Sequence, residues 1–167
     1  ADLLELSTKI AESVSSSLDL DVILDEATWE IANGFGISGV MIHLMDSERN
    51  ITKTASYGLK TTFVKSFPHE ILQSCLLSQE PKIRSIDADK PFMNESEREQ
   101  WNICLPLTSR NKGIGVVSLF GVEKGGDDSR KLFHAIGIDV LLHIAGLTAL
   151  AIENAVIHSE LKKIGRA

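Results

Sequence analysis

The residue types that most often do chemistry are sparse in this sequence. The two cysteines, Cys75 and Cys104, lie in apolar surroundings and lack the spacing of metal ligands. We therefore expect reduced, buried thiols, with a Cys75–Cys104 disulfide as the less favoured alternative. No two of the five histidines form a metal pair that a third ligand would complete. The sequence predicts no metal site and no cofactor.

The remaining candidates for catalysis are a histidine and two serines. His43 alternates with apolar neighbours in a predicted strand, and the favoured interpretation is a core histidine with its hydrogen bonds satisfied. Ser56 and Ser118 also lie in predicted strands, without the glycine turn that presents a nucleophilic serine. We expect no catalytic residue and no enzymatic activity. A small thiol-redox enzyme that uses Cys75 or Cys104 is a distant alternative.

A mostly apolar set of side chains with few polar groups is typical of a small-molecule pocket. Arg84, if it points inward, would bind an anionic ligand through two hydrogen bonds; the alternative is that it and Lys82 face water. Trp101 has a ring that can cover a ligand and an N–H that needs an acceptor. The alternative for the whole set is that it packs together and leaves no cavity. The expected pocket residues are Tyr57, Phe63, Phe67, Ile71, Cys75, Arg84, Ile86, Phe92, Met93, Trp101 and Cys104.

Composition places these residues in one compact domain. The chain has 167 residues, of which 43% are hydrophobic, so we expect a single domain over 1–167 with a substantial core. The net charge is −6 and the basic residues are dispersed, which argues against nucleic acid and against an anionic membrane as partners. Purely apolar runs are far shorter than the ~20 residues that a spanning helix needs. We expect a cytoplasmic protein.

Hydrophobic periodicity predicts the elements that must position the pocket. Two helices come first, Leu3–Ser17 and a second that starts at Asp19 or Asp21, buries Val22 among others and ends near Gly34 and Gly36. The segments that follow are a hairpin over 39–46 and 51–58, short helices over 62–67 and 70–78, a short strand over 82–86, a second hairpin over 102–108 and 114–121 with the turn SRNKG, and a helix from Ser129 to about Ile164. This order predicts an α+β fold with an antiparallel sheet.

The last predicted helix is longer than the domain. At ~1.5 Å per residue it would extend on the order of 50 Å, against roughly 30 Å for a small domain. The apolar residues of segments 1–17 and 152–167 recur every three or four positions, which is typical of a helix pair. We expect both segments to be connectors that form a homodimer; an ordinary helix that frays past the fold is the alternative. The expected interface residues are Leu3, Leu6, Ile10, Val14, Ile152, Val156 and Leu161.

Three segments carry a resemblance to a known family: SSSLDLDVIL (15–24), LPLTSRNKGIGVVSLFG (105–121) and ALAIENAV (149–156). With these the chain resembles a GAF domain over nearly its whole length. The resemblance implies an antiparallel sheet of about six strands, with the long N- and C-terminal helices and the second helix on one face. On the other face, short helices and loops would form a pocket whose wall runs from Phe63 to Phe92. It also implies dimerisation through the terminal helices and an output domain in the same chain, such as a histidine kinase, nucleotide cyclase or transcription activator.

The residues by which the named subclasses of that family bind their ligands are absent from this sequence. The sequence after the last strand is VEKGG, where cyclic-nucleotide-binding members have an asparagine-lysine pair, and the stretch ESEREQW has no histidine for haem. Leucine follows both cysteines, which fits neither bilin attachment nor methionine sulfoxide reduction. We therefore expect a non-catalytic sensing and dimerisation module of a two-component or similar signalling protein, with an unknown small-molecule ligand. A structural dimerising spacer without a ligand is the alternative.

Overall fold

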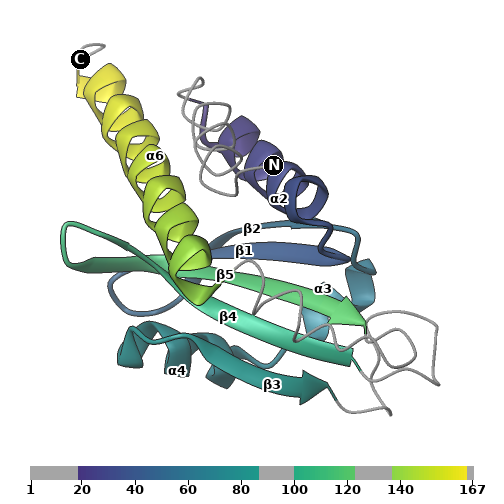
Figure 1. Ribbon diagram of the computed structural model, residues 1–167. Coiled ribbons are helices and arrows are strands. Elements are labelled where there is room, and N and C mark those ends of the chain that lie inside the picture. Colours follow the sequence, from purple (N-terminus) through teal and green to yellow (C-terminus); the bar gives the residue numbers. More distant parts are fainter. Residues whose placement is uncertain (1–18, 87–99, 123–136, 165–167) are drawn as a thin grey trace.

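The computed structural model describes residues 19–86, 100–122 and 137–164, and these form an antiparallel sheet covered by helices on both faces. The strands lie in the order β2-β1-β5-β4-β3 (Figure 1). The elements are α2 (Leu20–Phe35), β1 (Gly39–Met45), β2 (Ile51–Tyr57), α3 (Thr61–Ser66), α4 (His69–Ser78), β3 (Lys82–Ile86), β4 (Gln100–Ser109), β5 (Lys112–Val122) and α6 (Ile138–Ile164). The predicted α+β class is confirmed. The described part contains five strands where about six were expected.

A side-chain cap determines where helix α2 begins, and a left-handed glycine determines where it ends. The Asp19 carboxylate accepts hydrogen bonds from the backbone N–H groups of Asp21 (3.0 Å) and Val22 (3.5 Å), so Asp19 and not Asp21 is the N-cap. Gly36 ends the helix with φ 67°, a left-handed conformation that glycine adopts without steric cost. Val22 was expected to point inward, but it is 40% exposed because it lies in the first turn, beside the edge of the buried stripe.

The β4–β5 hairpin closes at the predicted turn. Ser109 pairs with Lys112, and the two residues between them, Arg110 and Asn111, have φ values of 53° and 63°. Two consecutive left-handed residues match the right-handed twist of the flanking strands. Pairing of β5 with both β1 and β4 then places it at the centre of the sheet.

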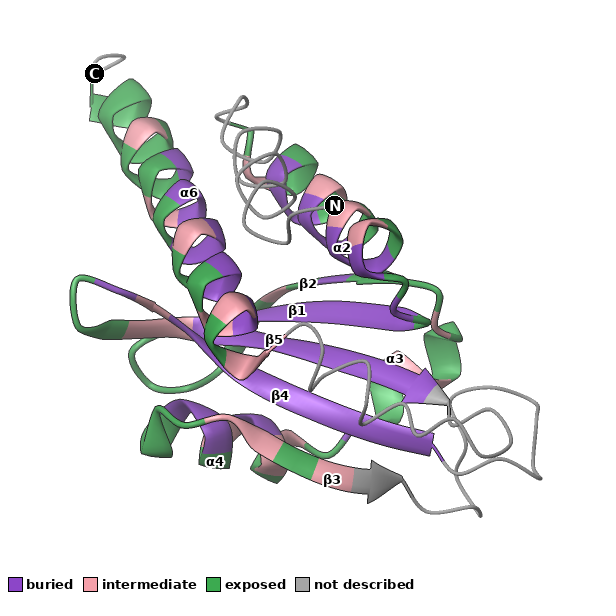
Figure 2. Cartoon of the chain, viewed as in Figure 1, coloured by how far each residue is buried: buried purple, intermediate pink, exposed green. Residues whose placement is uncertain are grey.

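The central strands are buried on both faces, so the sheet separates two hydrophobic cores. β1 is buried along its whole length and β4 along almost all of it (Figure 2). Alternate side chains of each strand point to opposite faces. On the face of α2 and α6 lie Val40, Ile42, Leu44, Ile103, Leu105, Leu107, Val117 and Leu119. On the face of α3 and α4 lie Met41, Met45, Cys104, Val116 and Phe120.

Helix α6 starts later than predicted. It begins at Ile138, and Gly137 just before it has φ 83°, which interrupts the expected run from Ser129. Its 27 residues give a length of ~40 Å. Its first turns pack on the sheet and on α2, whereas the residues from Val156 onward are mostly exposed and extend past the sheet (Figures 1 and 2).

By length and composition α6 is also apolar enough to cross a membrane. Polar residues such as His143 and Thr148 keep the purely apolar runs of the sequence short, whereas the mean hydropathy of the helix stays high in spite of them. Eight residues of α6 are buried against the rest of the domain, among them Leu141, Ala149 and Ile152. A helix that packs into a soluble core passes the same test of length and composition.

Some sequence predictions fall outside the described residues. These are the helix over 3–17 with Leu3, Leu6, Ile10 and Val14, and the pocket residues Phe92 and Met93.

Candidate functional site

Four polar side chains meet on the sheet face that α3 and α4 cover: Arg84, Asn102, Cys104 and Ser118. We call them the polar cluster. Strand register brings them together, because Arg84 of β3 lies opposite Asn102 of β4, and Cys104 of β4 lies opposite Ser118 of β5. Asn102 and Cys104 are two residues apart on one strand and therefore share a face. Asn102, Cys104 and Ser118 are each 0% exposed.

Hydrogen bonds fix the orientation of the cluster. The Asn102 amide donates from Nδ2 to the Leu119 carbonyl oxygen (3.1 Å), which turns Oδ1 toward β3. That oxygen accepts from Arg84 Nε (3.0 Å) and from the Cys104 thiol (3.4 Å). Cys104 Sγ also lies 3.3 Å from Ser118 Oγ. Since the thiol has one proton and donates it to Asn102, the Ser118 hydroxyl is the donor in this last contact.

Arg84 is the charged member of the cluster. Its guanidinium carbon lies 5.1 Å from the centre of the Phe67 ring, within the range of a cation–π contact. Burial lowers the pKa of Arg84, and the nearby Cys104 opposes that effect. Its hydrogen bond to Asn102 uses Nε alone. Among the residues that the structure describes, no carboxylate forms an ion pair with Arg84. A half-buried cation is thus held by one amide oxygen and one ring, without a counter-ion in this part of the chain.

Aromatic rings form the apolar side of the site. Phe63 and Phe67, from α3 and the residue that caps it, pack edge-on against Phe120 of β5, with ring centres 5.3 and 5.7 Å away. The two helix-side rings are themselves 6.1 Å apart. Leu72, Cys75 and Leu76 of α4 complete this second core. The arrangement combines one oriented cation with a wall of aromatic side chains, which is the composition of many small-molecule sites.

The two cysteines are free and buried, as the sequence predicts. Burial raises the pKa of Cys75 to about 12, with a further contribution from Cys104. Burial also raises the pKa of Cys104, although its hydrogen bonds with Ser118 and Asn102 oppose the shift. Because the thiolate is the nucleophile and the metal ligand, neutral buried thiols are poorly reactive.

His43 lies on the same sheet face and is 3% exposed. Burial lowers its pKa to about 4, and the neighbouring His69 contributes to the shift. The predicted burial is correct, but Nδ1 has no hydrogen-bond partner among the described residues. The expectation of a satisfied histidine is therefore wrong for this nitrogen, because the strand places it in an apolar layer between Met41 and Met45.

The structure brings several predicted pocket residues together and separates others. Phe63, Phe67, Ile71, Cys75, Arg84 and Cys104 share the α3–α4 side of the sheet. Trp101 belongs to the core on the α2–α6 side, and Tyr57 pairs with Val40, which also faces that side. The assignment of Trp101 and Tyr57 to the pocket is therefore wrong, because side chains alternate between the two faces along a strand. The backbone of Ile86 lies in β3, opposite Gln100, and its side chain is outside the described set.

Sequence reasoning missed Asn102, Ser118 and Phe120 as members of the site. The available signal was weak: an asparagine two positions before a cysteine in the strand WNICLPL shares the face of that cysteine. Nothing local to the sequence showed that Asn102 would meet Arg84, which is 18 positions earlier.

The predicted dimer residues on α6 differ in how far they are buried in the domain. Ile152 is 1% exposed and packs in the core of the domain, so it is not available to a partner and its assignment is wrong. It lies four positions after Thr148 and three before Ala155, both of which are buried on the same face. Val156 and Leu161 are 37% and 62% exposed.

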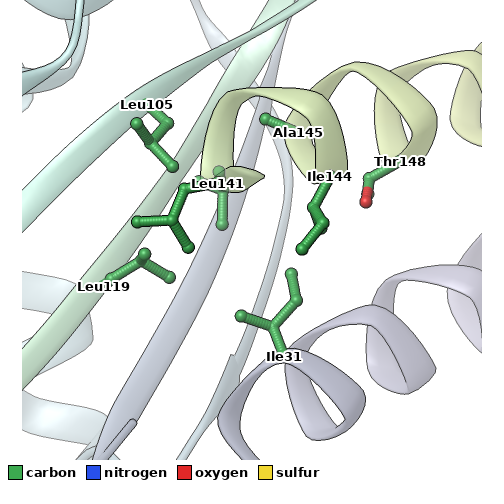
Figure 3. Close-up of a pocket in the computed structure, with 8 residues that line it drawn as sticks. Ile31, Leu105, Leu119, Leu141, Ile144, Ala145 and Thr148 are labelled. Atoms are coloured by element: carbon green, nitrogen blue, oxygen red, sulfur yellow. The ribbon is translucent and has the colours of Figure 1, made fainter. Parts of the chain in front are cut away.

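A cavity between α2, α6 and the sheet is a packing gap and not a ligand site (Figure 3). Its volume is about 10 Å³, which is close to the minimum for one water molecule. Apart from Thr148 its lining is aliphatic: Ile31, Leu105, Val117, Leu119, Leu141, Ile144 and Ala145.

A larger groove of about 540 Å³ lies between the start of α2 and the last turns of α6. Its lining is mostly polar and includes Asp21, Lys53, His158 and Lys162. The Lys53 ammonium already pairs with the Asp21 carboxylate there. The charged lining residues of α6, Glu160, Lys162 and Lys163, are exposed, and no hydrogen bond among the described residues orients them as Asn102 orients Arg84.

Comparison with known proteins identifies the fold. No family model matches the sequence, and no curated protein is similar to it. Solved structures are similar in fold at low identity. The free methionine-R-sulfoxide reductase from Neisseria meningitidis is 16% identical over 93% of this chain and 91% of its own, with a TM-score of 0.65. The GAF domain of a phosphoenolpyruvate-protein phosphotransferase from Coxiella burnetii is 13% identical over 95% and 96%, also with a TM-score of 0.65.

A GAF domain/HD domain protein from Geobacter sulfurreducens is 15% identical over 81% of this chain and 93% of its own, with a TM-score of 0.58. At these identities the likeness concerns the fold alone. The antiparallel sheet between two long helices and two short ones, with most of each chain aligned, gives one conclusion: the chain has the GAF fold.

Proposed function

We propose that this chain is a non-catalytic, small-molecule sensing and dimerisation module of a larger cytoplasmic signal-transduction protein. The ligand binds on the α3–α4 side of the sheet, and α6 carries the resulting change to an output domain in the same chain. Similar structures come from a phosphotransferase and from a protein that joins a GAF domain to an HD domain, which supports a place in a multidomain protein.

The polar cluster is the observation that carries the sensing proposal. A core that only filled space would not require a half-buried arginine, an oriented amide and two further polar groups under α4. Their burial is costly unless each group is paired, and the terminal nitrogens of Arg84 are left over. A ligand that binds them would complete the network.

Dimerisation is supported by the side of α6 that faces away from the core. Four apolar residues form what we call the outer stripe: Leu150, Ile157, Leu161 and Ile164, which are 44%, 36%, 62% and 71% exposed. Their spacings of seven, four and three residues are those of a heptad seam. Asn154 occupies the seam position between Leu150 and Ile157 and is exposed. A single asparagine at such a position favours a two-stranded coil in one register.

A test of the dimer uses two matched double variants. Ile157→Glu with Leu161→Glu places two carboxylates in the outer stripe, and Ser159→Glu with Lys163→Glu places two on the opposite side of the same turns. Sedimentation at tens of micromolar should show a dimer for the unchanged chain and the control, and a monomer for the stripe variant. A monomeric unchanged chain would contradict the dimer proposal.

Sensing is tested by hydrogen exchange. A compound that raises the melting temperature in a screen of neutral and charged metabolites should slow amide exchange in α3, α4 and β3 more than in α2. At 100 times its Kd a ligand adds ~2.7 kcal/mol to the stability of the chain. Protection confined to α2 and α6 would place the ligand on the other face and contradict the proposed site.

The alternative of a dimerising spacer is favoured by the outer stripe, which requires no ligand. A spacer and a sensor differ in one measurement, since only a sensor shows exchange protection on the α3–α4 side on adding a compound. The alternative of a thiol-redox enzyme is supported by the similarity in fold between this chain and the free methionine-R-sulfoxide reductase. The raised pKa of both thiols argues against it. Rapid alkylation of either cysteine in the folded chain would reverse that argument.

A further inference from the structure

We propose that Arg84 binds the carboxylate group of a small organic anion, with Lys82 as a second cation beside it. The inference rests on the sensing function proposed above and specifies the chemistry of its ligand.

The first argument is that no counter-ion is found in the part of the chain that the structure describes. Among the described residues neither Arg84 nor Lys82 forms an ion pair, although the whole chain carries a net charge of −6. Cations in partly buried positions are normally paired, because removing a charge from water is costly. The two side chains alternate with Ile83 on β3 and therefore share the face that α4 covers.

The second argument is the geometry of the guanidinium. Arg84 Nε is engaged with Asn102, whose amide is held in turn by the Leu119 carbonyl. The Phe67 ring lies against one side of the guanidinium. The two terminal nitrogens of Arg84 therefore remain available as hydrogen-bond donors, and together they form a planar fork whose orientation is fixed. A planar fork matches the two oxygens of a carboxylate by a pair of parallel hydrogen bonds.

The third argument is the local charge. Lys82 pairs with Cys104, two residues along β3 from the pair that Arg84 forms with Asn102. Its charge acts on this side of the sheet, since it lowers the pKa of Cys75, the α4 thiol of the second core. Two cations on one short strand attract an anion more strongly than either alone. Phe63, Phe67 and Phe120 offer apolar contact to the rest of the ligand.

The experiment compares charged probes with neutral ones of the same shape. Acetate, succinate and benzoate are titrated into the 167-residue chain, with acetamide, succinamide and benzamide as the neutral set and inorganic phosphate as a further anion. The readouts are melting temperature and the ¹⁵N–¹H signal of Arg84 Nε, which is assigned by its absence in Arg84→Lys. Arg84→Met removes the cation, and Arg110→Met is the control at an exposed arginine of the β4–β5 turn.

We expect at least one carboxylate to move the Arg84 signal and to raise the melting temperature at millimolar concentration, while its amide does neither. Binding should weaken at least tenfold in Arg84→Lys, which keeps the charge but loses the fork, and should be unchanged in Arg110→Met. The Arg84→Lys variant preserves the test if Arg84→Met does not fold.

Three outcomes would overturn the inference: no carboxylate in the set binds the unchanged chain, phosphate alone binds, or carboxylate binding survives Arg84→Met. Failure of the sensing proposal is distinguishable. A neutral compound that protects α3, α4 and β3 from exchange would support a sensor and overturn only the anionic ligand.

Discussion

Arg110, in the turn between β4 and β5, reaches Glu153 in the middle of α6, with Nε 3.2 Å from the carboxylate oxygen. The arginine side chain is 70% exposed and the glutamate side chain 18%. The contact joins the tip of a hairpin to the helix that extends past the sheet. Because one partner is in water, it adds little to stability and acts mainly to fix position.

A double-mutant cycle measures this link. Arg110→Met, Glu153→Gln and the double variant should give a coupling of about 0.2–1 kcal/mol in urea unfolding at low salt, and less at 1 M salt because ions screen the pair. Lys112→Met, at the neighbouring turn position, is the control and should show no coupling with Glu153→Gln. A coupling above about 2 kcal/mol would contradict the view of a surface pair.

Stability should fall in mild acid because of His43. Its pKa is lowered from 6.5 to about 4 in the folded chain. The unfolded chain therefore takes up a proton first, so the stabilisation is complete above pH 6.5 and is lost as the pH falls toward 4. For this residue alone the loss at pH 5 is about 2 kcal/mol. Urea unfolding at pH 7 and pH 5 measures it.

The matched variants for that measurement are His43→Leu and His143→Gln. Removing the buried imidazole should flatten the pH dependence by about 2 kcal/mol. His143→Gln replaces an exposed imidazole on α6 and is the control for the substitution itself. Equal slopes in the unchanged chain and in His43→Leu would show that other groups cause the acid sensitivity.

The two sides of α6 should respond differently to truncation. Ile152→Ala should cost about 2–5 kcal/mol of unfolding free energy, because the side chain is 1% exposed and leaves a cavity. Leu161→Ala, at a position 62% exposed, should cost less than about 0.5 kcal/mol in the monomer and should weaken the dimer instead. Equilibrium unfolding at two protein concentrations separates the effects. The reverse order of costs would mean that the core face of α6 is wrongly assigned.

Gly121 should not tolerate a side chain. An added Cβ would overlap the ring of Trp101, which packs against this glycine from the neighbouring strand. Gly121→Ala should cost about 1–3 kcal/mol and change the tryptophan fluorescence. Trp101→Leu should cost stability alone but relieve the clash, so that the double variant is less destabilised than the two single effects combined. Additive effects would indicate that the glycine has some other role.

Local sequence signals predicted the helices and strands well, but they predicted less well on which face of the sheet each side chain lies. The cap at Asp19, the glycine after α2, the turn before Lys112 and the strand at Lys82–Ile86 all depend on residues close together in the chain. Trp101 was assigned to the wrong core because a one-residue difference in a strand exchanges the two faces. The direction of Arg84 stayed open for the same reason, until the pairing of β3 with β4 decided it.

The error at Ile152 has a different physical cause. Helix α6 is apolar on the side that packs in the domain and apolar again along the outer stripe. Periodicity identifies a helical stripe, but it does not tell which of two stripes meets the core and which meets a partner. The polar cluster was not predicted as a unit because its bonds between three strands join residues that are 14 to 18 positions apart.

Strand β4 has a further consequence. Its residues alternate between Asn102 and Cys104, which belong to the polar cluster, and Ile103 and Leu105, which belong to the core under α2 and α6. One peptide unit thus separates a side chain of the proposed ligand site from a side chain that packs in the core under α6. Asn102 and Ile103 are joined by one planar peptide, so a displacement of the backbone at Asn102 has only the dihedrals at two Cα atoms in which to be absorbed before it reaches Ile103. The proposed signal from the polar cluster to α6 would therefore need no chain of side chains from one face to the other, because the backbone of a single strand connects the two faces.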